Sequence, residues 1–326
     1  MNKYVYRSSF KDEMLGFIKL RRAQGLRYMC GTVLRCLDTY LAEHPVAEKK
    51  LSPDFVDSWI AESFSALNPN TVNGYMMDYI QFAKYLNTLN IEAYLPIPSP
   101  HRQSYTPYIF SGSEVEAIFR AADNIKPGND SNADLWFPML LRLLYGCGLR
   151  LAEALSLTFT DVDIAEGVLF IRNAKGNKDR FVPMDISLTE ILKQYCVTIL
   201  RYNHDIIRLF ENSSGNKIGN SRARYWFRRT LRDAGIELLP GADDSQSRTR
   251  NICPNCFRHT FAVTSLHLQH GHSISNYRIT PLLSTYLGHN KLAGTQKYLH
   301  MTSEIAEDIH DATTAYSKGL FPEVPL

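Results

Sequence analysis

The chain has 326 residues, of which 44% are hydrophobic and 21% are charged. This length exceeds that of one average domain and the apolar content is too high for a disordered chain, so we expect two packed domains. The 36 Lys and Arg residues against 33 Asp and Glu leave a net charge of +3, a mild excess that permits an anionic partner without requiring one.

The sequence contains no segment typical of secretion or membrane insertion. Its first residues, MNKYVYRSSFKDEM, lack the uninterrupted apolar run of a signal peptide. The apolar stretch LWFPMLLRLLYGCGL is broken by Arg142 and is shorter than the ~18 residues that suggest a membrane-spanning helix. The six Cys residues lack the spacing of a disulfide framework. We therefore expect a soluble, reduced, cytoplasmic protein that does not contact a membrane.

The first ninety residues are predicted to be entirely helical. Apolar residues recur at helical spacing from Phe10 to Ile18 and again from about Tyr28 to Leu41. Ser52-Pro53 supplies an N-cap and a first-turn proline for a third helix, and Asn68-Pro69 precedes a fourth apolar stripe. This region contains no strand signal, which favours a compact all-α module.

The rest of the chain is predicted to be mainly helical with one β-hairpin. Residues 91–110 hold four prolines and no sustained periodicity, which is typical of an interdomain linker. The apolar runs Gly167–Ile171 and Arg180–Val182 flank a basic turn, which indicates a hairpin. Further helices are expected at residues 111–122, 134–145, 187–200, 221–234, 255–269, 280–287 and 292–299. The expected fold class is therefore an all-α N-terminal domain followed by an α+β domain.

Two segments in the second domain carry basic residues in a suggestive setting. In YGCGLRLAEALSL, Arg150 stands just before a helix and Glu153 one turn later, so the guanidinium can bind a phosphate while Glu153 orients it. Taken alone, an ordinary surface ion pair explains this pattern better. At the hairpin tip, Lys175 and Lys178 flank Gly176-Asn177. Such a turn can enter a DNA groove or simply be solvated.

Two later segments place polar groups beside apolar ones. Asn255, Arg258 and His259 share one face of a predicted helix. Polar groups beside so apolar a run need a partner, either structural or a ligand phosphate. His289 follows a helix-ending glycine, and Tyr298 stands nine residues later. Taken alone, a tyrosine at such a place is more often a packing or surface residue than a nucleophile.

Together these segments resemble the tyrosine recombinase (phage integrase) family. The family motifs run G-L-R-x-x-E, K-G-x-K-x-R, H-x-x-R-H, L-G-H and T-x-x-Y, and here they stand in that order as GLRLAE, KGNKDR, NCFRH, LGH and TQKY. The resemblance covers roughly residues 111 to 300. The catalytic set that it implies is Arg150, Lys175, Asn255, Arg258, His289 and Tyr298, with Glu153 and His259 in supporting positions.

The resemblance implies a DNA strand-exchange enzyme that needs no metal or other cofactor. Tyr298 would attack the scissile phosphate, forming a 3′-phosphotyrosine and releasing a 5′-hydroxyl. Arg150 and Arg258 would bind the non-bridging oxygens, and Lys175 would protonate the leaving oxygen. His289 would hydrogen-bond the phosphate. Because the bond energy is kept, the 5′-hydroxyl of another strand can reverse the step and join new partners.

The resemblance also implies a domain organisation and partners. Residues 1–90 would be a core-binding, SAM-like DNA-binding domain, 91–110 a linker, and 111–302 the catalytic domain. Residues 303–326 would contact a neighbouring protomer. The partners implied are double-stranded DNA with paired recombination sites and further copies of the chain in a homotetramer. The processes implied are DNA recombination, integration and transposition of a mobile genetic element.

One motif position departs from the family pattern. Asn255 stands where the family usually has His, and an amide can donate a hydrogen bond but cannot take the proton of Tyr298. His259 is adjacent to the second arginine, where the family also has His, usually in support. The proton acceptor is therefore open, and a catalytically impaired DNA-binding protein is the alternative function. A type IB topoisomerase shares the chemistry but acts alone on one site.

Basic residues and a cysteine pair complete the sequence features. The residues expected to contact DNA are Lys178, Arg180, Arg222, Arg224, Arg228 and Arg229. Aromatic residues 225–227 are interleaved with these arginines, which suits a DNA backbone, although a solvated helix face explains part of the pattern. Cys253 and Cys256 form half of a zinc-site pattern with no second half, so free thiols are expected rather than a metal.

Overall fold

The computed structural model describes residues 4–25, 31–98, 107–126, 132–172, 179–202, 206–212, 214–236, 252–270, 276–288, 292, 294–296 and 298. The chain divides into two compact units, one built mainly on residues 1–105 and the other on residues 106–242 and 249–326. Among the described residues, no helix combines the length and the apolar character that crossing a membrane would require. The fold is mainly helical with one small antiparallel sheet, as the sequence predicted.

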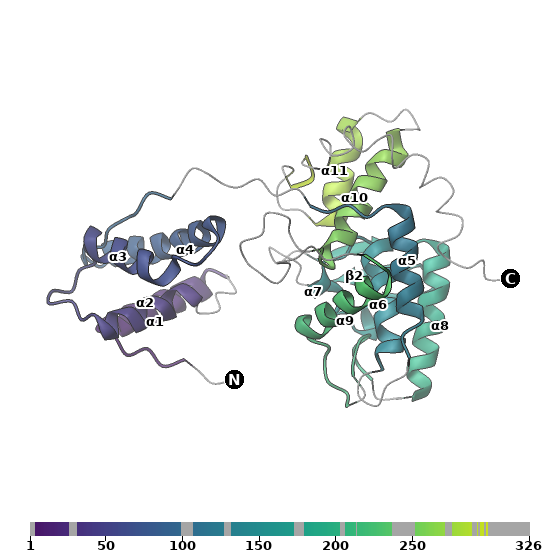
Figure 1. Cartoon of the computed structure of the whole chain (residues 1–326), viewed down its shortest axis with the longest axis horizontal. Helices are drawn as coiled ribbons and strands as arrows, with labels where there is room; N and C mark the ends of the chain where they lie inside the picture. Colours follow the sequence, from purple (N-terminus) through teal and green to yellow (C-terminus); the bar gives the residue numbers. More distant parts are fainter. Residues whose placement is uncertain are drawn as a thin grey trace. The chain divides into compact units, whose positions relative to one another are not determined.

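The N-terminal unit is a bundle of helices (Figure 1). Its described helices are α1 (Lys11–Ala23), α2 (Thr32–Glu43), α3 (Pro53–Phe64) and α4 (Pro69–Thr88). The predicted apolar stripes form its core, in which Phe10, Leu34 and Phe82 are fully buried. The Ser52 hydroxyl accepts a hydrogen bond from the backbone N–H of Phe55 at 3.3 Å, which confirms the predicted N-cap.

The C-terminal unit contains both helices and strands. Its described helices are α5 (Gly112–Asp123), α6 (Ala133–Gly146), α7 (Leu151–Ala154), α8 (Ile186–Tyr202), α9 (Asn220–Asp233), α10 (Asn255–His270) and α11 (Asn276–Leu287). A short 3-10 helix, η1 (Phe159–Asp161), leads into the sheet of β1 (Val162–Asp163), β2 (Val168–Ile171) and β3 (Arg180–Pro183), in the order β1-β2-β3. The predicted hairpin is β2 and β3, in which Leu169 pairs with Val182 and both are buried. The two-residue strand β1 was not predicted.

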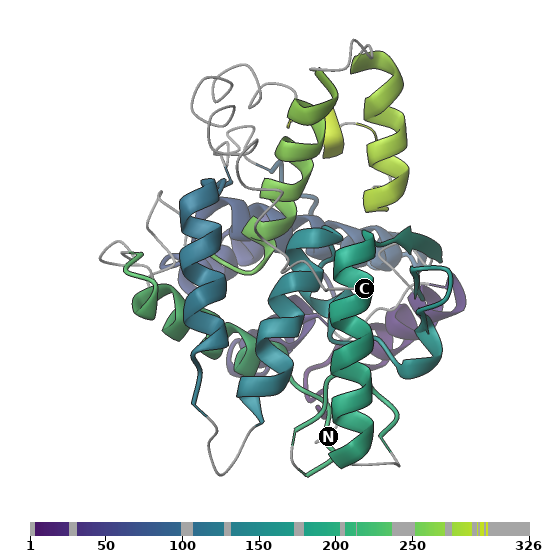
Figure 2. The same cartoon turned by 90° about the vertical axis from the view of Figure 1, so that its right-hand side faces the viewer.

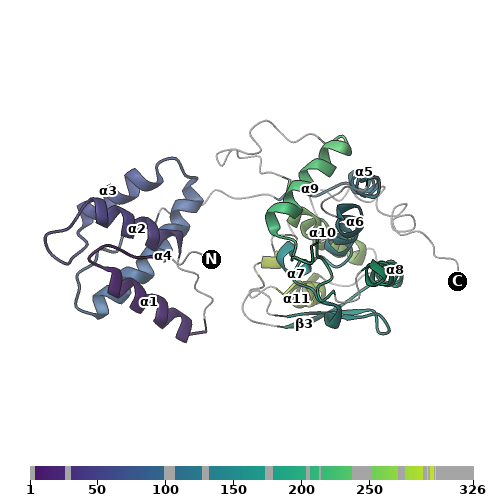
Figure 3. The same ribbon diagram turned by 90° about the horizontal axis from the view of Figure 1, so that it is seen from below.

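Helix α6 is the centre of the larger core because it carries buried apolar side chains on all of its faces. Figure 3 shows α6 between α5 and α8, and α6 also contacts α9 and α10. Phe257 of α10 is fully buried in this core, where its ring packs against Phe110, Phe119 and Phe227. The start of α10 is therefore held rigidly, and with it the residues that follow Phe257.

A smaller core joins α10 to α11, which lie side by side in Figures 1 and 2. It contains Ala262, Val263 and Leu266 of α10 and Ile279, Leu283 and Leu287 of α11, together with Tyr298. Helix α11 begins at Asn276 rather than at the predicted Thr280, so Pro281 lies inside the helix and not in its first turn. In the predicted segment 292–299, residues 294–296 and 298 are helical.

The turn between α6 and α7 requires glycine at position 148. Gly148 has φ +57°, and a Cβ there would lie 2.6 Å from Phe261 Cδ1 and 3.1 Å from Leu287 Cδ2. Gly148→Ala combines this clash with a left-handed backbone that costs a residue with a Cβ about 1–2 kcal/mol. We expect a lower Tm for the C-terminal unit in scanning calorimetry. The matched control is Gly235→Ala, because Gly235 has φ +73° but no neighbour within 4 Å. Equal losses in the two variants would show that the crowding at Gly148 carries no cost.

Candidate active site

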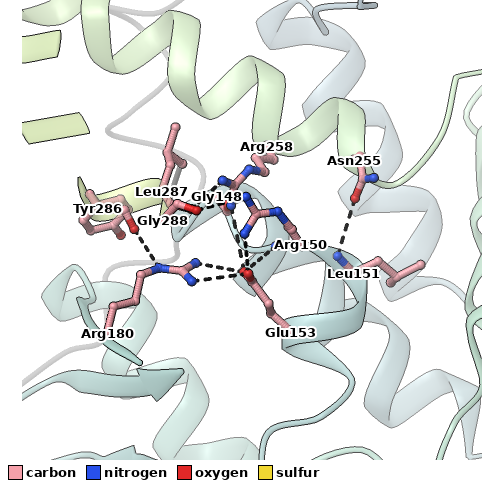
Figure 4. Close-up of polar contacts among 10 residues, drawn as sticks. All are labelled: Gly148, Arg150, Leu151, Glu153, Arg180, Asn255, Arg258, Tyr286, Leu287 and Gly288. Atoms are coloured by element: carbon pink, nitrogen blue, oxygen red, sulfur yellow. Dashed lines mark hydrogen bonds and ion pairs between the residues drawn. The ribbon is translucent and has the colours of Figure 1, made fainter. Parts of the chain in front are cut away.

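A buried carboxylate at the start of α7 binds two arginines from different parts of the chain (Figure 4). The Glu153 side chain is only 7% exposed. Its Oε1 accepts a hydrogen bond from Arg150 Nη1 at 2.6 Å, and its Oε2 accepts one from Arg180 Nη2 at 2.8 Å. Oε2 also accepts the backbone N–H of Arg150 at 3.1 Å. The contact that the sequence predicted between Arg150 and Glu153 is therefore made, with Arg180 as a further partner.

The pKa of Glu153 reflects these contacts. Burial alone would raise the pKa of this carboxyl. Hydrogen bonds and charge from Arg180, followed by the hydrogen bonds from Arg150, outweigh burial and lower the pKa to about 2. Glu153 is therefore ionised throughout the physiological range.

Arg258 is the most deeply buried cation of the cluster. Its side chain is 4% exposed, and it donates from Nη1 to the carbonyl of Gly148 at 2.8 Å and from Nη2 to the carbonyl of Leu287 at 2.5 Å. Nη1 also lies 3.9 Å from Glu153 Oε2. Burial, followed by the charge of Arg150, lowers the pKa of Arg258 to about 10. Arg258 is still charged at neutral pH and ties α10 to the turn before α7 and to the end of α11.

Arg150 is the more exposed of the two motif arginines. Its side chain is 24% exposed, and its Nη2 donates to the carbonyl of Gly288 at 3.2 Å. Figure 4 shows the guanidinium groups of Arg150 and Arg258 next to each other, with Glu153 beside them. Two planar donors held in this way are chemically suited to bind an anion with several oxygens, such as a phosphate.

Arg180 occupies a different setting from the one expected of a DNA contact. Its side chain is 10% exposed, and Nε donates to the carbonyl of Tyr286 at 2.9 Å while Nη2 binds Glu153. Arg180 thus ties β3 to both α7 and α11 inside the cluster. Arg180 was expected to contact DNA, and nothing in the neighbouring sequence distinguishes an inward-facing arginine from an outward-facing one.

Tyr298 lies in the small core, with its hydroxyl directed at a histidine. The residue is 1% exposed, and its Oη lies 2.7 Å from His259 Nδ1. Burial raises the pKa of Tyr298 to about 12, against the opposing effect of the positive charges of Arg258 and Arg150. The phenol is therefore protonated at neutral pH.

Asn255 is exposed at the first position of α10. Its Oδ1 accepts the backbone N–H of Leu151 at 3.5 Å, which links α10 to the start of α7 (Figure 4). Lys175, Lys178 and His289 lie outside the described residues. The structure thus brings Arg150, Arg258 and Glu153 together, and it joins Tyr298 to His259.

Helix α9 presents the predicted arginines on an exposed face. Arg222, Arg224, Arg228 and Arg229 are all exposed, and the last three line an open groove together with Tyr225 and Arg232. The guanidinium of Arg229 lies 5.0 Å from the centre of the Trp226 ring. The interleaved basic and aromatic side chains predicted from the sequence therefore occur together on one element.

The cysteine pair at the start of α10, Cys253 just before the helix and Cys256 in its first turn, consists of free thiols. The sulfur atoms of Cys253 and Cys256 are 4.0 Å apart, which is too far for a disulfide. In the part of the chain that the structure describes, no group of three or more His, Cys, Asp or Glu side chains is placed to hold a metal ion. Nothing there completes a zinc site around the pair.

Loss of the Glu153 charge is expected to destabilise the C-terminal unit. The pKa of Glu153 is lowered to about 2 on folding, so its stabilisation is present above the unfolded-state pKa and is lost as the pH falls toward 2. This difference corresponds to about 3 kcal/mol. In urea unfolding, Glu153→Gln should lose about this much at pH 7 and progressively less below pH 4.

The control is Glu116→Gln, which removes a carboxylate from the exposed ion pair with Arg120. Such a pair is worth about 0–1 kcal/mol. A Glu153→Gln protein as stable at pH 7 as the Glu116→Gln protein would contradict the view that this carboxylate holds the cluster.

The chain is similar to known proteins over more than half of its length. Residues 109–304 match the model of the phage integrase family. A putative integrase/recombinase, y4rE of Sinorhizobium fredii (strain NBRC 101917 / NGR234), is 30% identical over 200 residues, which are 59% of each chain. The tyrosine recombinase XerC of Listeria monocytogenes serotype 4b (strain F2365) is 27% identical over 222 residues, 67% of this chain and 66% of that protein. The match thus spans less than two thirds of the length of either relative.

A solved structure extends the similarity to the fold. The XerH site-specific recombinase, bound to a palindromic difH substrate in a post-cleavage complex, aligns with a TM-score of 0.64 at 18% identity and covers 85% of this chain and 76% of that one. The family match includes more than half of the chain, and it contains the residues clustered around Glu153 as well as Tyr298. This chain belongs to the phage integrase family.

Proposed function

We propose that the protein is a site-specific DNA recombinase that cuts and rejoins DNA through a covalent bond to Tyr298. The observation that carries this proposal is that two neighbouring residues of α10 contact the two groups that the reaction needs. Arg258 joins Arg150 at the Glu153 carboxylate, and the next residue, His259, contacts the Tyr298 hydroxyl. A phosphate-binding pair of arginines and a nucleophile are the two groups that phosphoryl transfer to tyrosine requires.

In the proposed cleavage step, Arg150 and Arg258 bind the non-bridging oxygens of the scissile phosphate. Their positive charge offsets the charge that develops in the transition state. The Tyr298 oxygen forms a bond to phosphorus as the bond to the 5′-oxygen breaks, and Lys175 gives that oxygen its proton. His289 and the amide of Asn255 donate hydrogen bonds to the phosphate. Rejoining is the reverse reaction with the 5′-hydroxyl of another strand.

The proposed partner is double-stranded DNA. Residues 1–90 act as the core-binding domain, and residues 91–110 connect them to the catalytic domain at 111–302. The exposed arginines of α9, together with Lys178, contact the phosphate backbone. DNA as the partner is supported by the fold similarity to XerH, whose solved complex contains a palindromic difH substrate. We further propose that a homotetramer assembles on two paired sites, with residues 303–326 contacting the neighbouring protomer.

The competing function is a DNA-binding protein that has lost its catalytic activity. Asn255 in place of the usual histidine favours this alternative. Against it, Tyr298 and both arginines are retained, although a protein that only binds DNA needs neither a nucleophile nor a buried arginine pair. A covalent adduct distinguishes the two functions.

Tyr298→Phe should abolish the adduct and leave DNA binding nearly unchanged. The substitution removes only the hydroxyl, and the ring still fills the core between α10 and α11.

The DNA site can be selected from a random duplex library by binding, and then nicked next to the cleaved phosphate so that the adduct is trapped. Covalent product is measured in denaturing gels and mapped by mass spectrometry. An adduct formed by the Phe variant would assign the nucleophile to another residue. The absence of adduct with the unmodified protein on its selected site would favour the alternative function.

Affinity for DNA should fall steeply with salt, because each phosphate that the protein neutralises releases counterions. The logarithm of the binding constant should fall with the logarithm of the salt concentration, with a slope of roughly −0.9 for each phosphate contacted. Arg224→Gln and Arg228→Gln should each reduce this slope by about one phosphate contact. Lys193→Gln, at an exposed position of α8, removes the same charge from another helix and serves as control. A slope that responds equally to all three changes would indicate a general charge effect rather than contact through α9.

A further inference from the structure

We propose that His259 takes the proton of Tyr298 during cleavage and returns it during rejoining, in place of the histidine that is missing at position 255. This proposal rests on the proposed function, because it assigns a role within the same reaction. It gives a catalytic part to a residue that the sequence placed only in support.

The geometry of the contact carries the inference. His259 Nδ1 lies 2.7 Å from the Tyr298 oxygen, which is hydrogen-bonding distance. The two rings are tilted by 48° with their centres 5.7 Å apart. The imidazole nitrogen therefore contacts the hydroxyl, and the imidazole ring does not stack on the phenol ring. The atom it contacts is the atom that forms the bond to phosphorus.

The position of His259 is fixed by its neighbours on α10. Arg258 is bound to the carbonyls of Gly148 and Leu287. The Thr260 hydroxyl donates to the carbonyl of Cys256 and accepts the backbone N–H of Phe110, each at 3.0 Å. A base presented by a rigid helix between two anchored residues keeps its geometry as the reaction proceeds.

Tyr298 needs a proton acceptor because its phenol does not ionise by itself at neutral pH. With a pKa of about 12, only about 10⁻⁵ of the phenol is ionised at pH 7. A neutral hydroxyl is a weak nucleophile, and a base within hydrogen-bonding distance typically raises the rate of such a step by ~10²–10⁴.

The other described side chains near this site do not fill the role. Both oxygens of Glu153 are occupied by arginines, and its pKa of about 2 makes it a poor base. Asn255 has no basic atom, and its amide oxygen accepts the N–H of Leu151. Arg150 and Arg258 are cations. A neutral imidazole with Nδ1 directed at the hydroxyl has the lone pair that the reaction needs.

The proposed transfer conserves charge and atoms. The Tyr298 proton moves to His259 Nδ1 and leaves an imidazolium, while the oxygen forms its bond to phosphorus. The bond from phosphorus to the 5′-oxygen breaks, and that oxygen receives a proton from Lys175. When a 5′-hydroxyl attacks the phosphotyrosine, it gives its proton to Lys175, and the imidazolium returns its own proton to the departing phenolate.

Single-turnover cleavage of a nicked substrate by His259→Asn tests the role. We expect a loss of ~10²–10⁴ relative to the unmodified protein. His267→Asn, the same change further along α10, should leave the rate unchanged. The loss should shrink when position 298 carries a fluorinated tyrosine, because a phenol that ionises at lower pH depends less on a base. If His259→Asn slowed cleavage equally with tyrosine and with fluorinated tyrosine at position 298, His259 would have only a structural role. If His259→Asn did not slow cleavage at all, His259 would have no part in the mechanism. In the latter case, an adduct from the unmodified protein would still support the proposed function.

A second measurement needs neither DNA nor cleavage. Fluorine NMR of the protein with fluorinated Tyr298 reports directly on the hydroxyl. His259→Asn should move the resonance and change its titration, whereas His267→Asn should do neither. An unchanged resonance and titration would show that the contact is absent in solution and would overturn the proposal. A dispersed amide-proton spectrum of the same sample verifies that the variant is folded.

Discussion

The arrangement of the site depends on one buried charge, the carboxylate of Glu153. Three guanidinium groups approach it, two by direct hydrogen bonds and Arg258 at 3.9 Å. Without a negative group among them, their mutual repulsion and the cost of burial would force the arginines apart. Because Glu153 is on α7, Arg180 on β3 and Arg258 on α10, this carboxylate also fixes the distances between three elements that are separate in the sequence.

Backbone carbonyls complete the arrangement because one carboxylate has too few acceptor positions for so many donors. The carbonyls of Gly148, Tyr286, Leu287 and Gly288 each accept from one of the three arginines. Gly148 and Gly288 both have positive φ, and a Cβ at Gly288 would lie 2.9 Å from Arg180 Nη1. The glycines of GLR and LGH therefore let backbone oxygens approach the cations as closely as hydrogen bonding demands. Motifs that resemble catalytic signatures also perform this structural work.

The proposed role of His259 would supply a proton acceptor one helical turn from position 255 without any change of scaffold. Asn255 retains polar contact with the start of α7 through Leu151 but has no proton-accepting atom. On the next turn of the same helix, His259 faces the phenol. Because residues four positions apart share one face of a helix, we propose that His259 takes the role that the family usually gives to the residue at position 255. Burial raises the pKa of Tyr298, and a phenol with a raised pKa depends more strongly on a nearby base.

Local patterns in the sequence were sufficient for the helices, the caps, the β2–β3 hairpin and the family. Periodicity, capping and motif order are properties of neighbouring residues and need no knowledge of the fold. The sequence also indicated the Arg150–Glu153 pair, because its partners are one helical turn apart. It could not indicate that Arg180 turns inward to Glu153, or that His259 meets Tyr298, which is 39 positions away. Those contacts arise only when α7, β3, α10 and α11 pack together, because side-chain direction and burial are set by elements distant in sequence.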